Sequence, residues 1–216
     1  MSEVGAGVTD LVLGAVLFAC AVRLRRSAQE HRYWELTMWS AGGAAFAGAA
    51  HHLVFAGSPR AADLSWVVVG VLVAVAISYL LAGTATATLD EWLARLVIRA
   101  RIAGLLAYAA VMAIVGIGRT TPLVLSESVT MAAVVALWFH AALIGRPGAG
   151  RMIVAIVVLA ASAIFFVFPA DAFPVLDARS LQHLGQIPGV LLLTQIAASG
   201  VLSAPRVAGR PAAGRI

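Results

Sequence analysis

Two adjacent histidines, His51 and His52, end an apolar stretch of the chain, and Asp63 follows after a short polar break. A third histidine, His183, lies near the start of the last apolar stretch. Imidazole and carboxylate groups act as general acids and bases, and they are also ligands of catalytic zinc. Whether these side chains can do such chemistry depends on the elements that hold them.

The composition predicts the class of protein. Of the 216 residues, 62% are hydrophobic and only 12% are charged. Soluble domains carry about 25% charged residues, so this chain has too few charged residues to form the polar surface of a soluble protein. The sequence therefore predicts an integral membrane protein. It contains no lysine, which excludes a retinal Schiff base and lysine-based Schiff-base enzymes.

Seven apolar runs are each long enough to cross a hydrocarbon core of about 30 Å at about 1.5 Å per residue. They cover about 5–23, 34–55, 65–88, 96–118, 123–144, 151–169 and 180–202. The breaks between them are short, which predicts a single all-α domain over 1–203, a bundle of seven transmembrane helices. The tail 204–216 is basic and broken by proline and glycine, and it is predicted to be a disordered cytoplasmic end.

The placement of arginines predicts the orientation of this bundle. With the N-terminus outside, the cytoplasmic side receives Arg23, Arg25, Arg26, Arg32, Arg95, Arg99, Arg101, Arg146, Arg151, Arg206, Arg210 and Arg215, and the outside keeps Arg60, Arg119 and Arg179. Cytoplasmic loops of membrane proteins are rich in arginine, so the N-terminus is predicted outside and the C-terminus inside. The same rule explains the net charge of +5 without nucleic-acid binding. The Ala/Arg/Gly/Val bias indicates a bacterial inner-membrane protein, with membrane lipids as its predicted partners.

Ionisable side chains inside a span are costly, so each is a functional candidate. On the predicted topology, Asp10, His52, Glu127 and His183 lie at similar depths in the outer third of the membrane. We therefore predict that they share one polar site. A further set is predicted to bind substrate or to support that site: His51, Gln186, Asp177 and Ser180.

Several of these residues also have a purely structural interpretation. Asp10 could cap a helix that begins slightly later than the apolar run. Glu127 could lie near the membrane interface. His51 points about 100° away from His52 on an α-helix, so only one of the two can face the bundle centre squarely, and we expect His51 to face the headgroups.

The seven-span, N-out topology and the segments "GAAHH" and "LQHLGQ" resemble the CREST superfamily. That superfamily includes the alkaline ceramidases and the adiponectin/progestin receptors, and this chain looks like a bacterial branch of it. The resemblance implies a zinc ion near one membrane face and hydrolysis of lipid amide bonds. It implies His52 and His183 as zinc ligands, with Asp63 as the acidic partner or a further ligand.

The chain departs from the family pattern at two positions. The last span of the family carries a second histidine four residues after the first, where this chain has Ile187. The serine expected one turn before the span-2 histidine is Gly48 here. These departures leave open whether the catalytic site is lost or different.

Two neutral imidazoles and one carboxylate can still form a three-ligand zinc site with an open position for water. The candidate carboxylates are Asp10, Asp63 and Glu127, and a spare one could act as a base on the metal-bound water. We therefore expect a zinc-dependent membrane hydrolase acting on a lipid amide or ester at the outer face. Two alternatives stay open: a non-catalytic ligand-binding or sensory bundle, and a b-type haem protein with one axial histidine from each of two spans.

Overall fold

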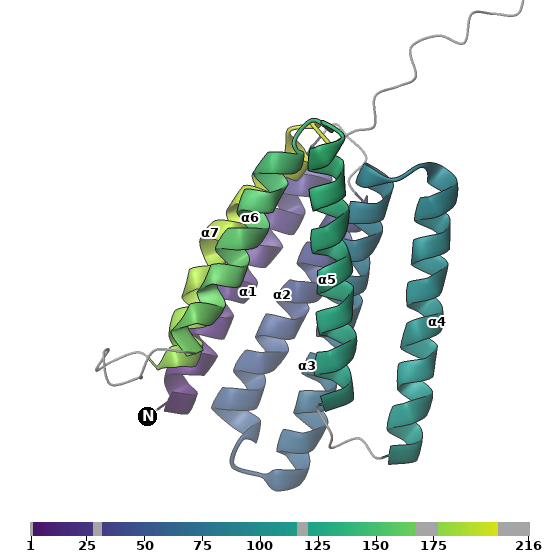
Figure 1. Ribbon diagram of the computed structural model, residues 1–216. Helices are drawn as coiled ribbons and strands as arrows, with labels where there is room; N and C mark the ends of the chain where they lie inside the picture. Colours follow the sequence, from purple (N-terminus) through teal and green to yellow (C-terminus); the bar gives the residue numbers. More distant parts are fainter. Residues whose placement is uncertain (1, 28–31, 116–120, 167–176, 203–216) are drawn as a thin grey trace, which may run out of the picture.

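The computed structural model describes residues 2–27, 32–115, 121–166 and 177–202, and these form a bundle of seven α-helices (Figure 1). The helices are α1 (Ser2–Arg26), α2 (Arg32–Ala50), α3 (Pro59–Thr88), α4 (Glu91–Val115), α5 (Thr121–Leu143), α6 (Ala149–Ala161) and α7 (Ala178–Ala198). A π-helix, η1 (His51–Phe55), continues α2, and a 3-10 helix, η2 (Ser162–Phe166), continues α6. The predicted all-α, seven-helix fold class is confirmed, and each predicted span overlaps one helix. The predicted tail 204–216 lies outside the described residues.

Within the described ranges, three helical segments are long and apolar enough to cross a membrane: Glu3–Arg26, Pro59–Thr88 and Val124–Leu143. α6 is apolar but shorter. Every backbone polar group in a bilayer must be satisfied within the protein, and helices achieve this on their own. The three segments therefore indicate a membrane protein.

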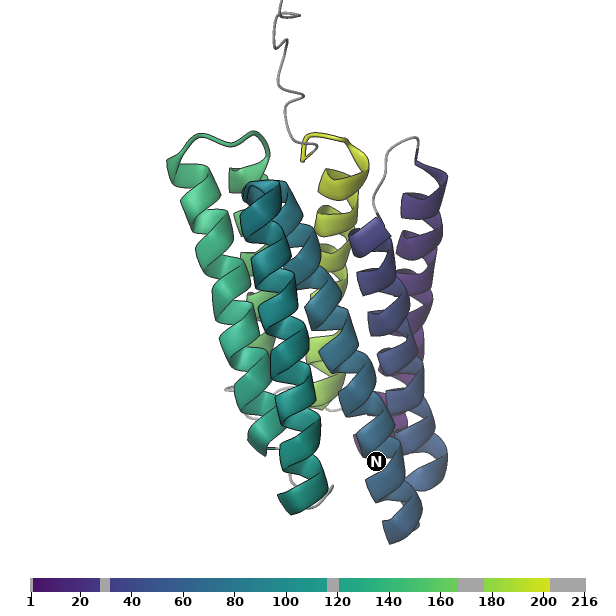
Figure 2. The same ribbon diagram turned by 90° about the vertical axis from the view of Figure 1, so that its right-hand side faces the viewer.

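Six of the helices share a core, and α4 lies at the outside of the bundle (Figures 1 and 2). α1 packs against α2 and α7, and α3 packs against α2 and α5. Trp138 of α5 is only 1% exposed, and its indole N–H donates to Thr84 Oγ1 of α3 at 3.1 Å. In α4, by contrast, Ala94 is the one buried apolar residue among those described.

Small residues bring α1 and α2 close together, as the Gly/Ala-rich run of the second span predicts. Gly42 of α2 faces the ring of Phe18 on α1, and a Cβ at this position would lie 2.3 Å from Phe18 Cδ1. Gly42, Ala44, Ala45, Gly48 and Ala49 are all buried. This close approach brings the end of α2 within reach of the polar side chains of α1.

The wider turn of η1 places both histidines of the pair inside the protein. The backbone N–H of Ala56 donates to the carbonyl of His51 at 2.8 Å, a bond to the fifth residue back that is typical of a π-helix. His51 and His52 are each 6% exposed. η1, the N-terminus and the start of α7 lie at the same end of the bundle (Figure 1).

Candidate functional site

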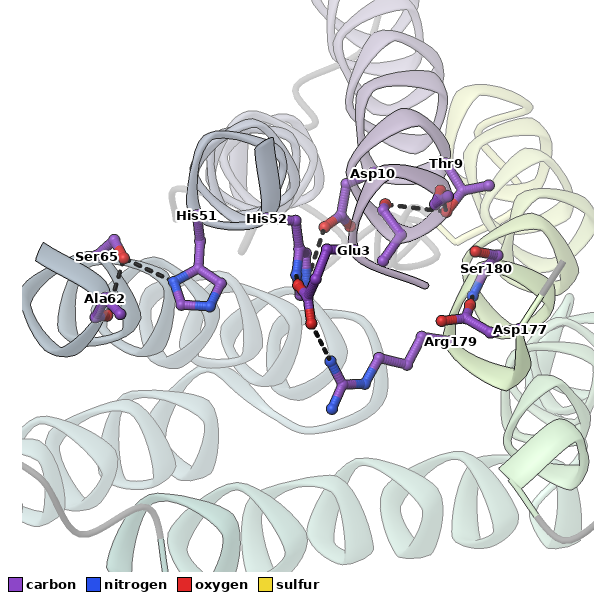
Figure 3. A network of polar contacts seen from close by, with 12 residues as sticks. Glu3, Thr9, Asp10, His51, His52, Ala62, Ser65, Asp177, Arg179 and Ser180 are labelled. Carbon is purple, nitrogen blue, oxygen red and sulfur yellow. Dashed lines mark hydrogen bonds and ion pairs between the residues drawn. The ribbon is translucent and has the colours of Figure 1, made fainter. Parts of the chain in front are cut away.

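The centre of the candidate site is a buried carboxylate, Asp10 of α1, which is 5% exposed. On one side stands His52 of η1, whose Nε2 lies 4.0 Å from Asp10 Oδ2 (Figure 3). The other ring nitrogen, Nδ1, lies 2.5 Å from Oε2 of Glu3. Glu3 and Asp10 are seven residues apart, so they lie on the same face of α1 two turns from each other. His52 therefore stands between two carboxylates of one helix.

His183 of α7 stands on the other side of Asp10. Its Nδ1 lies 3.2 Å from Asp10 Oδ1 and 3.4 Å from Thr9 Oγ1. The prediction that His52 and His183 meet a carboxylate at one end of the bundle is consistent with this geometry, and the carboxylate is Asp10. The alternative that Asp10 caps a later helix start is wrong, because α1 already begins at Ser2.

Gly48 of α2 makes room for this carboxylate. A Cβ at position 48 would lie 2.6 Å from Asp10 Oδ2 and 3.3 Å from its Cγ. A serine here, as in the family that the sequence resembles, would therefore compete with Asp10 for the same space. The glycine is thus part of the arrangement around Asp10.

A cavity of about 410 Å³ opens beside Asp10. Its polar end is lined by Asp10, His52, Trp66, Arg179, Gln182, His183 and Gln186. Its remaining walls are apolar and come from α1, α2 and α3: Leu13, Leu17, Ala41, Ala44, Ala45, Gly48, Val69, Val73, Ala76 and Ile77. Cavities of about 300–1,000 Å³ with apolar walls and a few convergent polar groups are typical of small-molecule sites.

His51 does not face the headgroup region as predicted. Its Nδ1 lies 2.7 Å from the hydroxyl of Ser65 on α3, and its ring centroid is 4.5 Å from that of Trp66. The π-helix is the reason, because its wider turn lets both histidines point inward. His51 links η1 to α3 behind His52.

Asp177 and Ser180 organise the start of α7. Asp177 is the N-cap residue, and its Oδ1 accepts a hydrogen bond from the backbone N–H of Ser180 at 2.8 Å. Burial acts to raise the pKa of Asp177, but hydrogen bonding to Ser180 together with the nearby charges of Arg179 and His183 outweighs it and leaves this pKa below its usual value. Ser180 itself is fully buried, and its Oγ faces Gly5 of α1. Both residues therefore support the helix that carries His183.

Of the three predicted zinc ligands, Asp63 does not join His52 and His183. Asp63 is exposed near the start of α3, away from the walls of the cavity. Across the described ranges, no three His, Cys, Asp or Glu side chains form a group that could hold a metal ion. The set His52, His183 and Asp63 therefore does not fit a three-ligand zinc centre.

Residues 6–200 match a family of unknown function, DUF6962. The chain belongs to this family. The matched region contains Asp10, the two histidines of η1, and His183, while Glu3 precedes it. No curated protein and no solved structure matches the chain.

In this DUF6962 protein Glu127 lies in a different cluster, contrary to the prediction of one shared layer. Its carboxylate pairs with the guanidinium of Arg101 on α4, with Nη2 2.8 Å from Oε1 and 3.0 Å from Oε2. The two side chains are 8% and 10% exposed. The arginines predicted to lie on the cytoplasmic side therefore include one, Arg101, whose side chain is buried in the bundle.

The rest of the Arg101 guanidinium is also satisfied by the protein. Nη1 donates to Ser126 Oγ at 3.1 Å and Thr130 Oγ1 at 2.8 Å, and Nε donates to Ser78 Oγ at 2.9 Å. Nη2 reaches the carbonyl of Ala74 at 3.4 Å. Each of the three guanidinium nitrogens has an acceptor within the protein. We therefore interpret this cluster as a structural one that holds α4 against α3 and α5.

Sequence reasoning missed Glu3 and Arg101. Glu3 could have been identified as a site residue from its spacing of seven residues from Asp10, because this spacing places both on one helix face. The signal for Arg101 was its position several residues inside an apolar run, where an unpaired charge is costly. A hydroxyl-rich segment, Ser126 to Thr130, offered acceptors for it on another span.

Proposed function

We propose that the chain is a multi-pass bacterial inner-membrane protein that binds an amphiphilic molecule in the cavity beside Asp10. The observation that supports this most strongly is the lining of the cavity, which is apolar along α1, α2 and α3 and polar at the Asp10 end. An amphiphile would place its chain between the aliphatic walls and its head group among the polar side chains. The proposal corresponds to the ligand-binding alternative from the sequence.

The orientation of the bundle belongs to the same proposal. Many arginines lie at the opposite end of the bundle from Asp10, including Arg23, Arg25 and Arg26 in the last turn of α1. With that end in the cytoplasm, as arginine-rich ends usually are, the head-group site faces the outside. An amphiphile would then reach the cavity from the outer leaflet.

The zinc-dependent lipid hydrolase is the second candidate. It is favoured by two imidazoles flanking one buried carboxylate, a set of groups suited to acid–base chemistry. It is opposed by the lack of a three-residue metal group in the described part of the chain. A haem with His52 and His183 as axial ligands has less support, because Asp10 stands between the two rings.

Native mass spectrometry of the protein extracted from its own membrane in a mild non-ionic detergent tests the proposal. We expect one amphiphile per chain in the wild type. Val73→Phe should fill the cavity and remove the bound mass, because Val73 lines its apolar wall. Val71→Phe is the matched control, since Val71 is 54% exposed on the same helix. A wild type without bound amphiphile, or a Val73→Phe variant that keeps it, would rule the proposal out.

Gly48→Ala should weaken binding from the head-group end. The new methyl group would displace the Asp10 carboxylate, which lies 2.6 Å from the position of the added Cβ. A hydrogen bond to a charged group contributes about 1.5–3 kcal/mol, so we expect a loss of affinity of at least about tenfold. Gly43→Ala is the control on α2, because its Cβ would make only ordinary contacts with Leu72 at 3.7 and 3.8 Å. Equal binding by the two variants would contradict this role of Gly48.

A further inference from the structure

The ring of His52 presents a hydrogen-bond acceptor toward the cavity. A carboxylate can only accept hydrogen bonds, so the contact of 2.5 Å with Glu3 requires the proton on Nδ1 of His52. In the neutral imidazole the other nitrogen, Nε2, then carries a lone pair. This nitrogen is the one that lies 4.0 Å from Asp10 Oδ2.

The same reasoning applies to His183. The Thr9 hydroxyl uses its proton toward the carbonyls of Gly5 and Ala6, each at 3.0 Å. Thr9 Oγ1 therefore accepts from His183 Nδ1 at 3.4 Å, and Asp10 Oδ1 lies 3.2 Å from the same nitrogen. The second nitrogen of His183 is left as an acceptor, and the residue lines the cavity.

One oxygen of the Asp10 carboxylate, Oδ2, has no hydrogen-bond donor among the described side chains. Asp10 is 5% exposed, and none of the side-chain hydrogen bonds found among the described residues ends on its Oδ2. A buried carboxylate is unfavourable unless donors satisfy its oxygens, and Asp10 lines the cavity, from which a donor can reach Oδ2. An atom placed between Oδ2 and His52 Nε2 can lie at hydrogen-bond distance, about 2.7–3.2 Å, from both, because the two are 4.0 Å apart.

The charges near the site point to a cation. Glu3 is neutralised in part by Arg179, whose Nη1 lies 3.9 Å from Oε1, and both side chains are about half exposed. Asp10 has two imidazoles as neighbours and no arginine in contact with it among the described residues. Arg179 also lines this end of the cavity, but its guanidinium lies beside Glu3 and is about half exposed, so no arginine stands against the buried carboxylate of Asp10.

We propose that the amphiphile carries a primary ammonium head group, so that the ligand class is an alkyl amine. This inference rests on the proposed function of the cavity. An ammonium offers three N–H donors and one positive charge, which match Asp10 Oδ2 and the free nitrogens of His52 and His183. A hydroxyl has one donor and no charge, and a carboxylate or phosphate head would be repelled by Asp10. The indole of Trp66, which also lines this end, adds an aromatic face suited to a cation.

Three probes with the same eight-carbon chain test the head group: octylamine, octan-1-ol and octanoate. Octylamine is protonated at neutral pH, as a lysine side chain is. Binding to the purified full-length protein is measured by titration calorimetry, with Val73→Phe as the blank for partition into detergent. We expect octylamine to bind at least about tenfold more tightly than octan-1-ol, and octanoate to bind least.

Asp10→Asn should lower the affinity for octylamine by at least about tenfold and lower that for octan-1-ol by less, because only the ammonium also loses a charge partner. Gly48→Ala gives a second readout if Asp10→Asn does not fold, because it displaces the carboxylate without removing it. If octan-1-ol or octanoate bound as tightly as octylamine, the proposal of an ammonium head group would be wrong. The proposal that the cavity binds an amphiphile would not be contradicted by that result. Failure of all three probes to bind, together with no co-purified amphiphile, would overturn both.

Discussion

Arg101→Ala is expected to destabilise the bundle by about 3–5 kcal/mol, the cost of leaving one member of a buried ion pair without its partner. Glu127 is only 10% exposed, and Arg101 is its charged partner across the α4–α5 interface. The substitution also removes the donors to Ser78, Ser126 and Thr130. The free energy of unfolding, measured by titration with a denaturing detergent, should fall accordingly. Glu127→Ala should cost a similar amount.

Two controls separate the ion pair from the general effect of removing an arginine. Arg95→Ala on the same helix breaks an exposed pair with Glu91, where the side chains are 53% and 84% exposed. Exposed pairs four residues apart on a helix contribute about 0.3–0.5 kcal/mol, so the change should be small. The double variant Arg101→Met with Glu127→Leu should be close to the wild type or more stable, because neither charge remains. An Arg101→Ala variant as stable as Arg95→Ala would show that the cluster does not fasten α4.

Gly189→Val is expected to force α6 and α7 apart. A Cβ at Gly189 would lie 2.5 Å from Leu159 Cγ and 2.9 Å from the backbone nitrogen of Leu159, and a backbone atom cannot move aside as a side chain can. Overpacking of this kind costs about 1–3 kcal/mol, and more where the backbone is involved. Because α7 carries His183, the variant should also weaken amphiphile binding.

Gly104→Val on α4 is the matched control for this change. It introduces the same β-branched side chain into a helix, but nothing lies within 4 Å of the added Cβ. We expect its free energy of unfolding to stay within about 1 kcal/mol of the wild type, because the helix propensities of glycine and valine differ by less than that. Equal losses in Gly104→Val and Gly189→Val would mean that the α6–α7 contact does not limit stability.

The helices could be predicted from the sequence because the physical constraint on them is strong. A long apolar run that enters a membrane must satisfy its own backbone polar groups, which a helix does, and each of the seven apolar runs overlaps a helix. The π-helix at His51–Phe55 could not be predicted in this way. It depends on which carbonyl the N–H of Ala56 selects, and that choice follows from the packing of α1 and α3 around η1.

The candidate site could be predicted only in part. The depths of Asp10, His52 and His183 along their spans brought the right three side chains to one end of the bundle. The resemblance to the CREST superfamily favoured Asp63 as the acidic partner of His52, but Asp63 is exposed near the start of α3 and does not line the cavity. Whether a side chain faces the cavity depends on how its helix is rotated about its own axis. A single sequence indicates the depth of a residue along its helix more clearly than it indicates this rotation.

Glu127 is a second residue for which depth along the helix did not predict its contacts. Its depth matched that of Asp10, but its helix lies against α3 and faces α4, where Arg101 binds its carboxylate. Arg101 was assigned to the cytoplasmic end by the charge rule, which counts arginines near span ends without asking what they contact. Pairing a buried arginine with a hydroxyl-rich span would have identified both residues.

An experimental structure of the protein purified from its own membrane in mild detergent tests the central claim most directly. The account predicts elongated density between α1, α2 and α3, ending in a head group at hydrogen-bond distance, about 2.7–3.2 Å, from Asp10 Oδ2 and His52 Nε2. Density for a metal ion bound by the two histidines would contradict it, and so would a cavity filled only by ordered water.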